Sequence, residues 1–339
     1  MTFRGTSLCA GLLALATLVS PVHAQNASIY AAADSVALAT PEAVTNQVAT
    51  LGAHFRAALP GERDRARAIY RWMVENIAYD AALFFRGGGV LATNSQLPER
   101  VLRRRLGVCE GFSGLYTALA QAAGLEARSV VGDAKAYSTD PRRSFRIQQH
   151  AWNAVRVEGG EWLLLDASWG AGDIEGRQFV RRPRDFYFAT PPEVLVWSHR
   201  GRSAADQLLE QPVSAAEFER MPFTHPGLWS LGFSPDQLRQ AYQQPQWPGL
   251  VSAYGAPGLD ITVVEAPLTA NLPSGVPQRF SVRAGAATEV VVVSGTTWTR
   301  LERENDTFTG SASLTGPELV VMTRYPERPE GVVVLKYTQ

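Results

Sequence analysis

Apolar residues recur at helical spacing through the first third of the chain. The first run begins at Thr40, a residue type that caps helix N-termini, and Pro60-Gly61 ends it. The last run begins at Cys109 and ends at Gly124, a residue type favoured at helix C-termini. The pattern predicts four helices, over residues 41–59, 62–77, 99–105 and 109–123.

Strand patterns follow the last helix. A strand is predicted over residues 127–131, then a polar loop over 134–149 with its turn at Asp140-Pro141. A hairpin comes next, with strands over 151–157 and 162–167 joined by Glu158-Gly159-Gly160. Residues 183–250 are rich in proline and aromatic residues and have weak periodicity, which predicts irregular structure. Short β-rich runs suggest a small C-terminal β-sandwich; they span residues 261–264, 278–282, 289–293, 319–323 and 332–337.

The N-terminus resembles a secretory signal. Arg4 provides the positive charge, residues 8–19 the apolar segment, and residues 22–24 a cleavage site before Gln25. An uncleaved anchor is the alternative, but the apolar run is shorter than the ~20 residues that span a bilayer. We therefore expect an exported protein without a membrane span. The predicted division is a signal peptide (1–24), a helical segment (25–61), a catalytic core (62–200), an irregular extension (201–257) and the β-sandwich (258–339).

Charge excludes some partners. The chain has 339 residues, of which 45% are hydrophobic and 19% charged, as in an ordinary globular protein with a sizeable core. Lys+Arg and Asp+Glu both number 32, so no overall field attracts nucleic acid or an anionic membrane. We expect a protein or peptide partner and no nucleic acid.

Cysteine usage draws attention to one residue. The chain has two cysteines, and Cys9 lies inside the predicted signal, so the mature chain would hold Cys109 alone. A lone thiol forms no internal disulfide, and an oxidising compartment usually selects against an idle one. The alternative is that Cys109 is only a small hydrophobic side chain buried in the core, as free cysteine most often is.

The surroundings of Cys109 favour a nucleophile. A helix N-terminus favours a negative charge and so lowers a thiol pKa from about 8.5. Gly107 and Gly111 would allow a substrate to approach closely, and the backbone N–H of Cys109 could stabilise an oxyanion. Glu110 opposes ionisation of the thiol, so we expect its carboxylate to face away or to bind an amine.

A thiolate needs a base, and the mature chain offers four histidines. His54 lies on an early helix. His199 and His225 lie in the irregular region; either could serve as the base, but neither is close to a carboxylate in a paired strand. His150 begins the hairpin whose return strand carries Asp166.

Register decides whether this histidine and this aspartate can meet. A two-residue turn would place His150 and Asp166 on opposite faces of the hairpin, whereas the three-residue turn Glu158-Gly159-Gly160 sets Trp152 opposite Asp166. His150 and Asp166 would then be diagonal neighbours on one face. The triad Cys109, His150 and Asp166 therefore requires the three-residue turn or an equivalent bulge. A zinc site built from these three residues is a weaker hypothesis, because the sequence lacks the paired CxxC or HxxxH spacing of zinc ligands. We therefore expect no metal.

Three segments resemble the transglutaminase-like superfamily in order and sequence: residues 107–112 (GVCEGF), 150–153 (HAWN) and 165–172 (LDASWGAG). Residues 68–80 resemble the helix that precedes them. Parts of residues 186–218 are similar to kyphoscoliosis peptidase and related bacterial proteins. The resemblance implies an α+β fold with a papain-like core, in which a cysteine helix packs on an antiparallel sheet.

The resemblance also implies roles for residues. Cys109 would form a thioester, His150 would transfer the proton, and Asp166 would hold the imidazole, without any cofactor. The second oxyanion donor stays open among three candidates: Gln96, Tyr137 and Gln149. Two tryptophans, Trp152 and Trp169, are expected to line the site. The leading hypothesis is an exported peptidase or transglutaminase-type acyltransferase acting on proteins or peptides. The alternative is a non-catalytic interaction module of the cell envelope.

Overall fold

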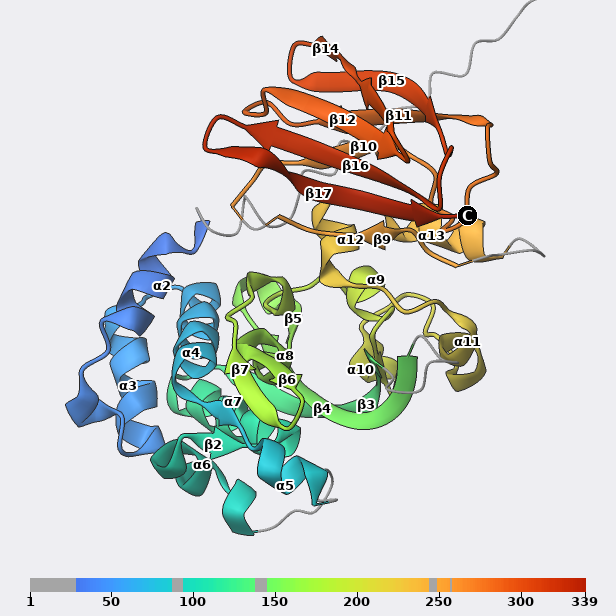
Figure 1. Ribbon diagram of the computed structural model, residues 1–339. Helices are drawn as coiled ribbons and strands as arrows, with labels where there is room; N and C mark the ends of the chain where they lie inside the picture. Colours follow the sequence, from blue (N-terminus) through green and yellow to red (C-terminus); the bar gives the residue numbers. More distant parts are fainter. Residues whose placement is uncertain (1–28, 87–93, 138–144, 244–248, 257) are drawn as a thin grey trace, which may run out of the picture.

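A computed structural model describes residues 29–86, 94–137, 145–243, 249–256 and 258–339 (Figure 1). The predicted signal and the Asp140-Pro141 turn lie outside these residues. Within them, no helix is both long enough and apolar enough to cross a membrane.

Helices dominate the first part of the chain, and they carry their apolar residues on the side that packs on the core. One predicted helix is interrupted, because the Thr45 hydroxyl donates to the Glu42 carbonyl and closes a turn. The backbone is then extended at Gln47 before the next helix begins. The observed elements are α2 (Ala31–Leu38), η1 (Glu42–Val44), α3 (Val48–Ala58), α4 (Glu62–Asn76), α5 (Ala81–Phe85), η2 (Asn94–Gln96), α6 (Pro98–Arg104) and α7 (Cys109–Ala122).

The central sheet has the strand order β5-β4-β3-β8. Its strands are β3 (Glu126–Tyr137), β4 (Phe145–Arg156), β5 (Trp162–Leu165) and β8 (His199–Gly201), and all neighbours are antiparallel. Helix α7 packs on β3 and β4 and is itself covered by α3 and α4. A separate pair, β1 (Ala78–Tyr79) and β2 (Leu106–Gly107), runs parallel just before α7. The predicted loop over residues 134–149 is therefore mostly strand, because β3 continues to Tyr137 and β4 starts at Phe145.

The region predicted to be irregular contains short helices. Proline occupies the first turn of three of them, where its fixed φ favours the helix and its missing N–H costs nothing. After β5 the elements are α8 (Ala167–Ala171), β6 (Gly172–Glu175), β7 (Gln178–Arg181), η4 (Asp185–Tyr187), α9 (Pro192–Leu195), α10 (Ala204–Gln207), α11 (Ala215–Arg220), α12 (Pro226–Ser230) and α13 (Pro235–Tyr242).

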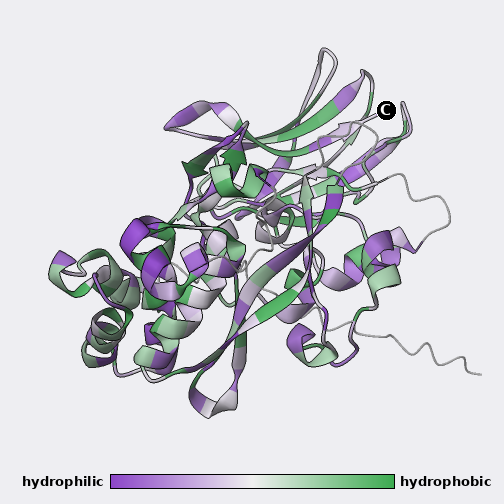
Figure 2. Ribbon diagram, turned by 90° about the horizontal axis from the view of Figure 1, so that it is seen from below, coloured by the Kyte–Doolittle hydropathy of each residue, from purple (hydrophilic) through white to green (hydrophobic). Residues whose placement is uncertain are grey.

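Two antiparallel sheets form the C-terminal part, with the orders β10-β11-β15-β14 and β13-β12-β16-β17-β9. They enclose side chains such as Phe280, Val292 and Tyr337, which are buried. In Figure 1 these sheets lie above the core, with α12, β9 and α13 between the two parts. Hydrophobic and hydrophilic residues alternate along many of the strands and helices (Figure 2), as one-sided burial requires.

The strands of these two sheets are β9 (Ser252–Ala253), β10 (Thr262–Glu265), β11 (Pro277–Arg283), β12 (Glu289–Ser294), β13 (Thr297–Arg300), β14 (Glu302–Glu304), β15 (Thr307–Ser313), β16 (Glu318–Tyr325) and β17 (Arg328–Thr338). The sequence pattern predicted five of them and missed four: β9, which has two residues, and β13, β14 and β15, whose residues are largely polar.

Candidate active site

Helix α7 begins at Cys109, as the sequence predicts, and its first turn is held by a side chain from η2. The Gln96 Oε1 atom accepts a hydrogen bond of 2.9 Å from the backbone N–H of Val108, and the Gln96 side chain is buried. Gly111 makes room for that amide, because a Cβ atom there would lie 2.2 Å from Oε1. Gln96 therefore fixes the chain on the N-terminal side of Cys109.

The hairpin has the three-residue turn that the triad requires. Asn153 pairs with Leu165 and Arg156 with Trp162, which sets Trp152 opposite Asp166. Gly159 has a φ of 75°, the left-handed conformation that glycine adopts without strain. His150 and Asp166 consequently share a face, and the His150 Nε2 atom lies 2.7 Å from Asp166 Oδ2. The predicted register and contact are confirmed.

Asp166 is a carboxylate surrounded by donors. Its Oδ1 atom accepts from the backbone N–H of Ser168 at 2.8 Å, the Ser168 hydroxyl at 2.7 Å and the backbone N–H of Trp169 at 3.1 Å, and so caps α8. Burial alone would raise the pKa of Asp166, but the charge and hydrogen bond of His150, with a hydrogen bond from His199, lower it well below its usual range. The side chain is therefore ionised at neutral pH.

The imidazole of His150 connects this carboxylate to the thiol. Burial lowers the pKa of His150, but Asp166 and a hydrogen bond with Cys109 outweigh burial and raise the pKa to about 10. Burial likewise opposes ionisation of Cys109, yet the hydrogen bond and charge of His150, with the backbone N–H of Ala151, lower the pKa of the thiol. Both shifts favour a thiolate–imidazolium pair, the reactive form of a cysteine nucleophile.

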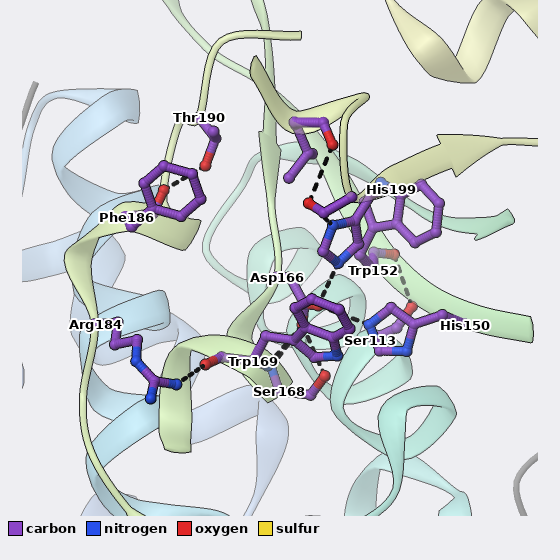
Figure 3. Close-up of polar contacts among 12 residues, drawn as sticks. Ser113, His150, Trp152, Asp166, Ser168, Trp169, Arg184, Phe186, Thr190 and His199 are labelled. Carbon is purple, nitrogen blue, oxygen red and sulfur yellow. Dashed lines mark hydrogen bonds and ion pairs between the residues drawn. The ribbon is translucent and has the colours of Figure 1, made fainter. Parts of the chain in front are cut away.

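A second histidine, His199, also binds Asp166, and here the sequence prediction was wrong (Figure 3). His199 lies on β8, which pairs with β3, and its Nε2 atom is 3.1 Å from Asp166 Oδ2. Burial lowers the pKa of His199, so the ring is neutral, donates from Nε2 to Asp166 and accepts at Nδ1 from the Ser198 hydroxyl at 2.8 Å. The carboxylate thus has a further donor, which β8 brings to it from about thirty residues along the chain.

The two predicted tryptophans lie against the histidines. The ring centroids of Trp152 and Trp169 are 6.0 and 5.3 Å from that of His150, and the Trp169 ring is 4.4 Å from that of His199. Trp152 is buried, and a Cβ atom at Gly132 would come within 2.4 Å of its ring. Arg184 donates to the Trp169 carbonyl at 3.3 Å. These rings restrict rotation of both imidazoles and keep water from them.

Among the oxyanion candidates, the backbone N–H of Cys109 is at the helix start as expected. Gln96 uses its oxygen on Val108, and its Nε2 atom donates to the Ser95 hydroxyl at 3.1 Å, so it braces the loop. Gln149 is exposed and lies on the opposite face of β4 from His150. The side chain of Tyr137 lies outside the described part of the structure.

Comparisons with known proteins match part of this chain. The model of the transglutaminase-like superfamily matches residues 49–167. The chain contains a transglutaminase-like domain. Kyphoscoliosis peptidase of Homo sapiens is 33% identical over 159 residues, which are 46% of this chain and 23% of that protein. The Lim and transglutaminase domain protein ltd-1 of Caenorhabditis elegans is 28% identical over 198 residues, 52% of this chain and 26% of that protein.

The chain therefore spans about a quarter of the length of the curated relatives it matches. Among solved structures, the periplasmic domain of TgpA from Pseudomonas aeruginosa is 21% identical with a TM-score of 0.29, covering 40% of this chain and 47% of that one.

A cavity of about 520 Å³ adjoins the triad of the transglutaminase-like domain. Tyr79 and Trp169 form part of its wall, and the Trp169 ring lies against that of His150. Aromatic side chains contribute much of the rest, together with Gln148, which shares the face of β4 with His150. The main aromatic lining residues are Tyr79, Phe84, Phe85, Trp169, Phe179, Tyr187 and Phe223.

Tyr79 is a second residue that the sequence prediction did not assign to the site. Burial and the nearby Cys109 raise the pKa of its phenol well above the ordinary value. The only signal in the sequence was its place in residues 77–80, one of the segments similar to the superfamily.

Glu110 is half-buried, and its Oε2 atom has no hydrogen-bond partner among the described residues. The amine partner that the sequence suggested is therefore not found in that part of the chain. The charges that act on the Cys109 pKa come instead from His150 and Asp166.

One group of side chains could geometrically hold a cation: His150, Asp166 and His199 offer ligand atoms within 4.8 Å of one another. Both Nε2 atoms, however, are directed at the same carboxylate oxygen, as protonated nitrogens that donate hydrogen bonds. A metal would have to displace both protons, so the hydrogen-bond network fits a general-base assembly better.

Proposed function

We propose that this protein is an exported, cysteine-dependent enzyme that acts on amide bonds of proteins or peptides through a thioester on Cys109. One observation carries the proposal: His150 is hydrogen-bonded to Asp166 at 2.7 Å, and the same imidazole lowers the pKa of the Cys109 thiol. Because Asp166 occupies Nε2, the Nδ1 atom is left for the thiol. The names of the similar proteins, a peptidase and a transglutaminase domain protein, support amide chemistry.

In this mechanism the Cys109 thiolate attacks the carbonyl carbon of an amide, and the π electrons move to the oxygen. When the tetrahedral intermediate collapses, the C–N bond breaks and His150 gives its proton to the departing amine. Cys109 then holds the acyl group as a thioester. Water or a second amine attacks this thioester while His150 accepts the proton of the nucleophile, which yields an acid or a new amide and restores the thiolate.

A free strand edge supports a peptide as substrate. In the described part of the chain, β5 pairs with β4 only over Asn153–Arg156, so Phe145–Trp152 has β3 on one side alone. The backbone N–H of Ala151, which lies on this edge, helps to lower the pKa of the Cys109 thiol. An extended chain that adds to the edge would pass the thiol, and the adjacent cavity would take one of its side chains.

The decisive experiment compares hydrolysis with transfer in one sample. A proteome-derived peptide mixture is incubated with the wild-type protein and a fluorescent primary amine, and mass spectrometry records cleaved peptides and amine-labelled peptides. Either product supports the proposal if it is lost in Cys109→Ala and His150→Ala. If neither product forms, or both persist in Cys109→Ala, the proposal is wrong and the non-catalytic interaction module becomes the better reading.

Export is part of the same proposal and rests on residues 1–24. N-terminal sequencing of protein recovered from outside the cytoplasm is expected to begin at Gln25. Recovery from the cytoplasm with residue 1 or 2 at the N-terminus would contradict it.

A further inference from the structure

Charge is distributed unevenly around the cavity beside the triad. Three basic residues, Lys135, Arg146 and Arg184, line it, whereas Asp173 is the one acidic residue among the described residues of its wall. The whole chain has equal numbers of basic and acidic residues, 32 of each, so this positive excess is local. The cavity therefore favours a group that carries negative charge.

The acidic groups on this side of the cavity are already paired. Asp173 forms ion pairs with Arg184 and, at 3.2 Å, with Arg182, and Arg182 has a second partner in Glu175. Arg184 also donates to the Trp169 carbonyl at 3.3 Å (Figure 3). Two arginines and two carboxylates balance one another here, so these side chains build the wall and leave no charge for a ligand.

Two other arginines are held against the cavity without such partners. In the described part of the chain, the guanidinium groups of Arg146 and Arg177 lie over aromatic rings, 5.8 Å from the centre of Phe84 and 4.6 Å from that of Phe85. Both rings line the cavity, and Phe85 is 38% exposed, which places Arg177 at its mouth. A guanidinium that lies over a ring keeps its N–H groups available to a carboxylate.

Arg146 is also in register with the triad. It lies four residues before His150 on β4, with Gln148 between them, and alternate residues of a strand share a face. Four residues of strand span about 13 Å. The edge of β4 over Phe145–Trp152 is free in the described structure, so a peptide added there would bring a side chain about four residues from its reacting amide to Arg146.

We propose that Arg146 and Arg177 make this cavity a binding site for acidic peptides; that the bound peptide is the acyl donor rests on the proposed function. The methylene groups of a glutamate pack on Phe84 or Phe85, and its carboxylate accepts hydrogen bonds from the guanidinium above the ring. The two arginines select the substrate and move no proton. Nucleophilic attack stays with Cys109, whose thiolate does not depend on them.

Binding is measured on the Cys109→Ala protein, which cannot turn a peptide over. Three peptides of serine, alanine and glycine share a central glutamine and a neutral fluorophore. They differ at the positions three and four residues to either side, which carry glutamate, glutamine or lysine. By fluorescence anisotropy we expect the glutamate peptide to bind about 20-fold more tightly than the glutamine peptide, and the lysine peptide to bind most weakly. The advantage should shrink as salt is added, because exposed charges are screened.

Replacing the arginines in the same background tests their part. Arg146→Gln and Arg177→Gln should each weaken binding of the glutamate peptide by about fivefold, the upper end for an exposed ion pair, and by roughly 20-fold together. The glutamine peptide should bind within about twofold of its original affinity. Arg100→Gln is the matched control, because Arg100 is an exposed arginine of α6 that does not line the cavity. Urea unfolding of each variant verifies that it is folded.

Each outcome has a distinct meaning. An acidic preference that disappears in the double variant supports the inference. Equal affinity for the glutamate and glutamine peptides, or no binding of either at millimolar concentration, would overturn it. A preference that survives the double replacement would also overturn it, because the carboxylates would then bind elsewhere. So would equally tight binding of a short DNA oligonucleotide, since the site would then accept any polyanion.

Catalysis is read separately, with wild-type protein and the same three peptides. If the acidic preference holds in binding but no peptide gives a product, the proposed function fails and the site belongs to the non-catalytic interaction module. If all three peptides give product at equal rates, the proposed function stands and the inference is overturned.

Discussion

Replacing Asp166 with asparagine isolates the charge that organises the site. The backbone N–H groups of Ser168 and Trp169 can only donate, so the new side chain must keep its oxygen toward them. Its NH₂ group then faces His150 and His199, whose rings can change tautomer while the backbone cannot. His150 consequently presents an unprotonated Nε2 atom and loses the partner that favours imidazolium.

The size of the effect follows from the pKa of His150. A rise from 6.5 to about 10 corresponds to about 5 kcal/mol in favour of imidazolium. Asp166 is the largest of the groups that raise it, and Cys109 contributes the remainder, so a preference for imidazolium of well over tenfold depends on the carboxylate. An ordinary thiol with a pKa of about 8.5 is still about 3% ionised at pH 7, so the loss of thiolate levels off near 30-fold.

The assay is the second-order rate of iodoacetamide alkylation between pH 5 and 10. At pH 7 we expect Asp166→Asn to react about 30-fold more slowly than wild type, and the two rates should converge above about pH 9, where an ordinary thiol ionises unaided. Asp206→Asn, which removes a carboxylate paired with Arg128 outside the site, should match wild type. A rate for Asp166→Asn within about threefold of wild type at pH 7 would refute the reasoning. A tenfold change in rate corresponds to about 1.4 kcal/mol, so a threefold change would mean that the carboxylate contributes much less than the pKa of His150 requires.

Three further predictions concern stability. Gly111→Ala should lower the free energy of unfolding by about 1–3 kcal/mol, because its Cβ would meet Gln96 at 2.2 Å. A Cβ at Gly114 would have its nearest atom at 4.0 Å, so Gly114→Ala should raise the free energy of unfolding by about 0.5–1 kcal/mol. Equal urea midpoints for the two variants would contradict this. His199→Asn should cost about 1.5–3 kcal/mol by urea unfolding, yet leave alkylation within about threefold of wild type; a loss as large as in the Asp166 variant would assign His199 to the reaction itself. Lys135→Met should raise Tm at pH 7. Burial lowers the pKa of Lys135 to about 7, so between pH 7 and about 10.5 the folded protein binds fewer protons than the unfolded chain. Wild-type stability rises over that range, so the gain should shrink toward pH 10, and calorimetry that shows a gain independent of pH would contradict it.

The hairpin could be predicted because its constraints are local. Side chains alternate along a strand, and the number of residues in the turn fixes the register, so Gly159 and Gly160 were enough to bring His150 and Asp166 together. The start of α7 was equally local, since the glycines around Cys109 and the apolar spacing after it suffice.

The remaining site residues come from long-range packing, which sequence spacing does not encode. His199 reaches Asp166 because a three-residue strand, β8, adds to the far side of β3. Tyr79 reaches Cys109 because a two-residue parallel bridge joins segments almost thirty residues apart. Elements this short carry no periodic pattern, so their partners are decided by the packing of the whole core.

The burial of the triad bears on the choice between an enzyme and an interaction module. Cys109, His150 and Asp166 are 5%, 3% and 1% exposed, and a buried carboxylate is costly unless donors surround it. The fold supplies five such donors to Asp166 and directs His150 at the lone cysteine of the described chain, although apolar side chains would fill the same space more cheaply. A binding surface has no use for a charged network that it does not expose. An enzyme does, because excluding water strengthens the hydrogen bonds that ionise the thiol.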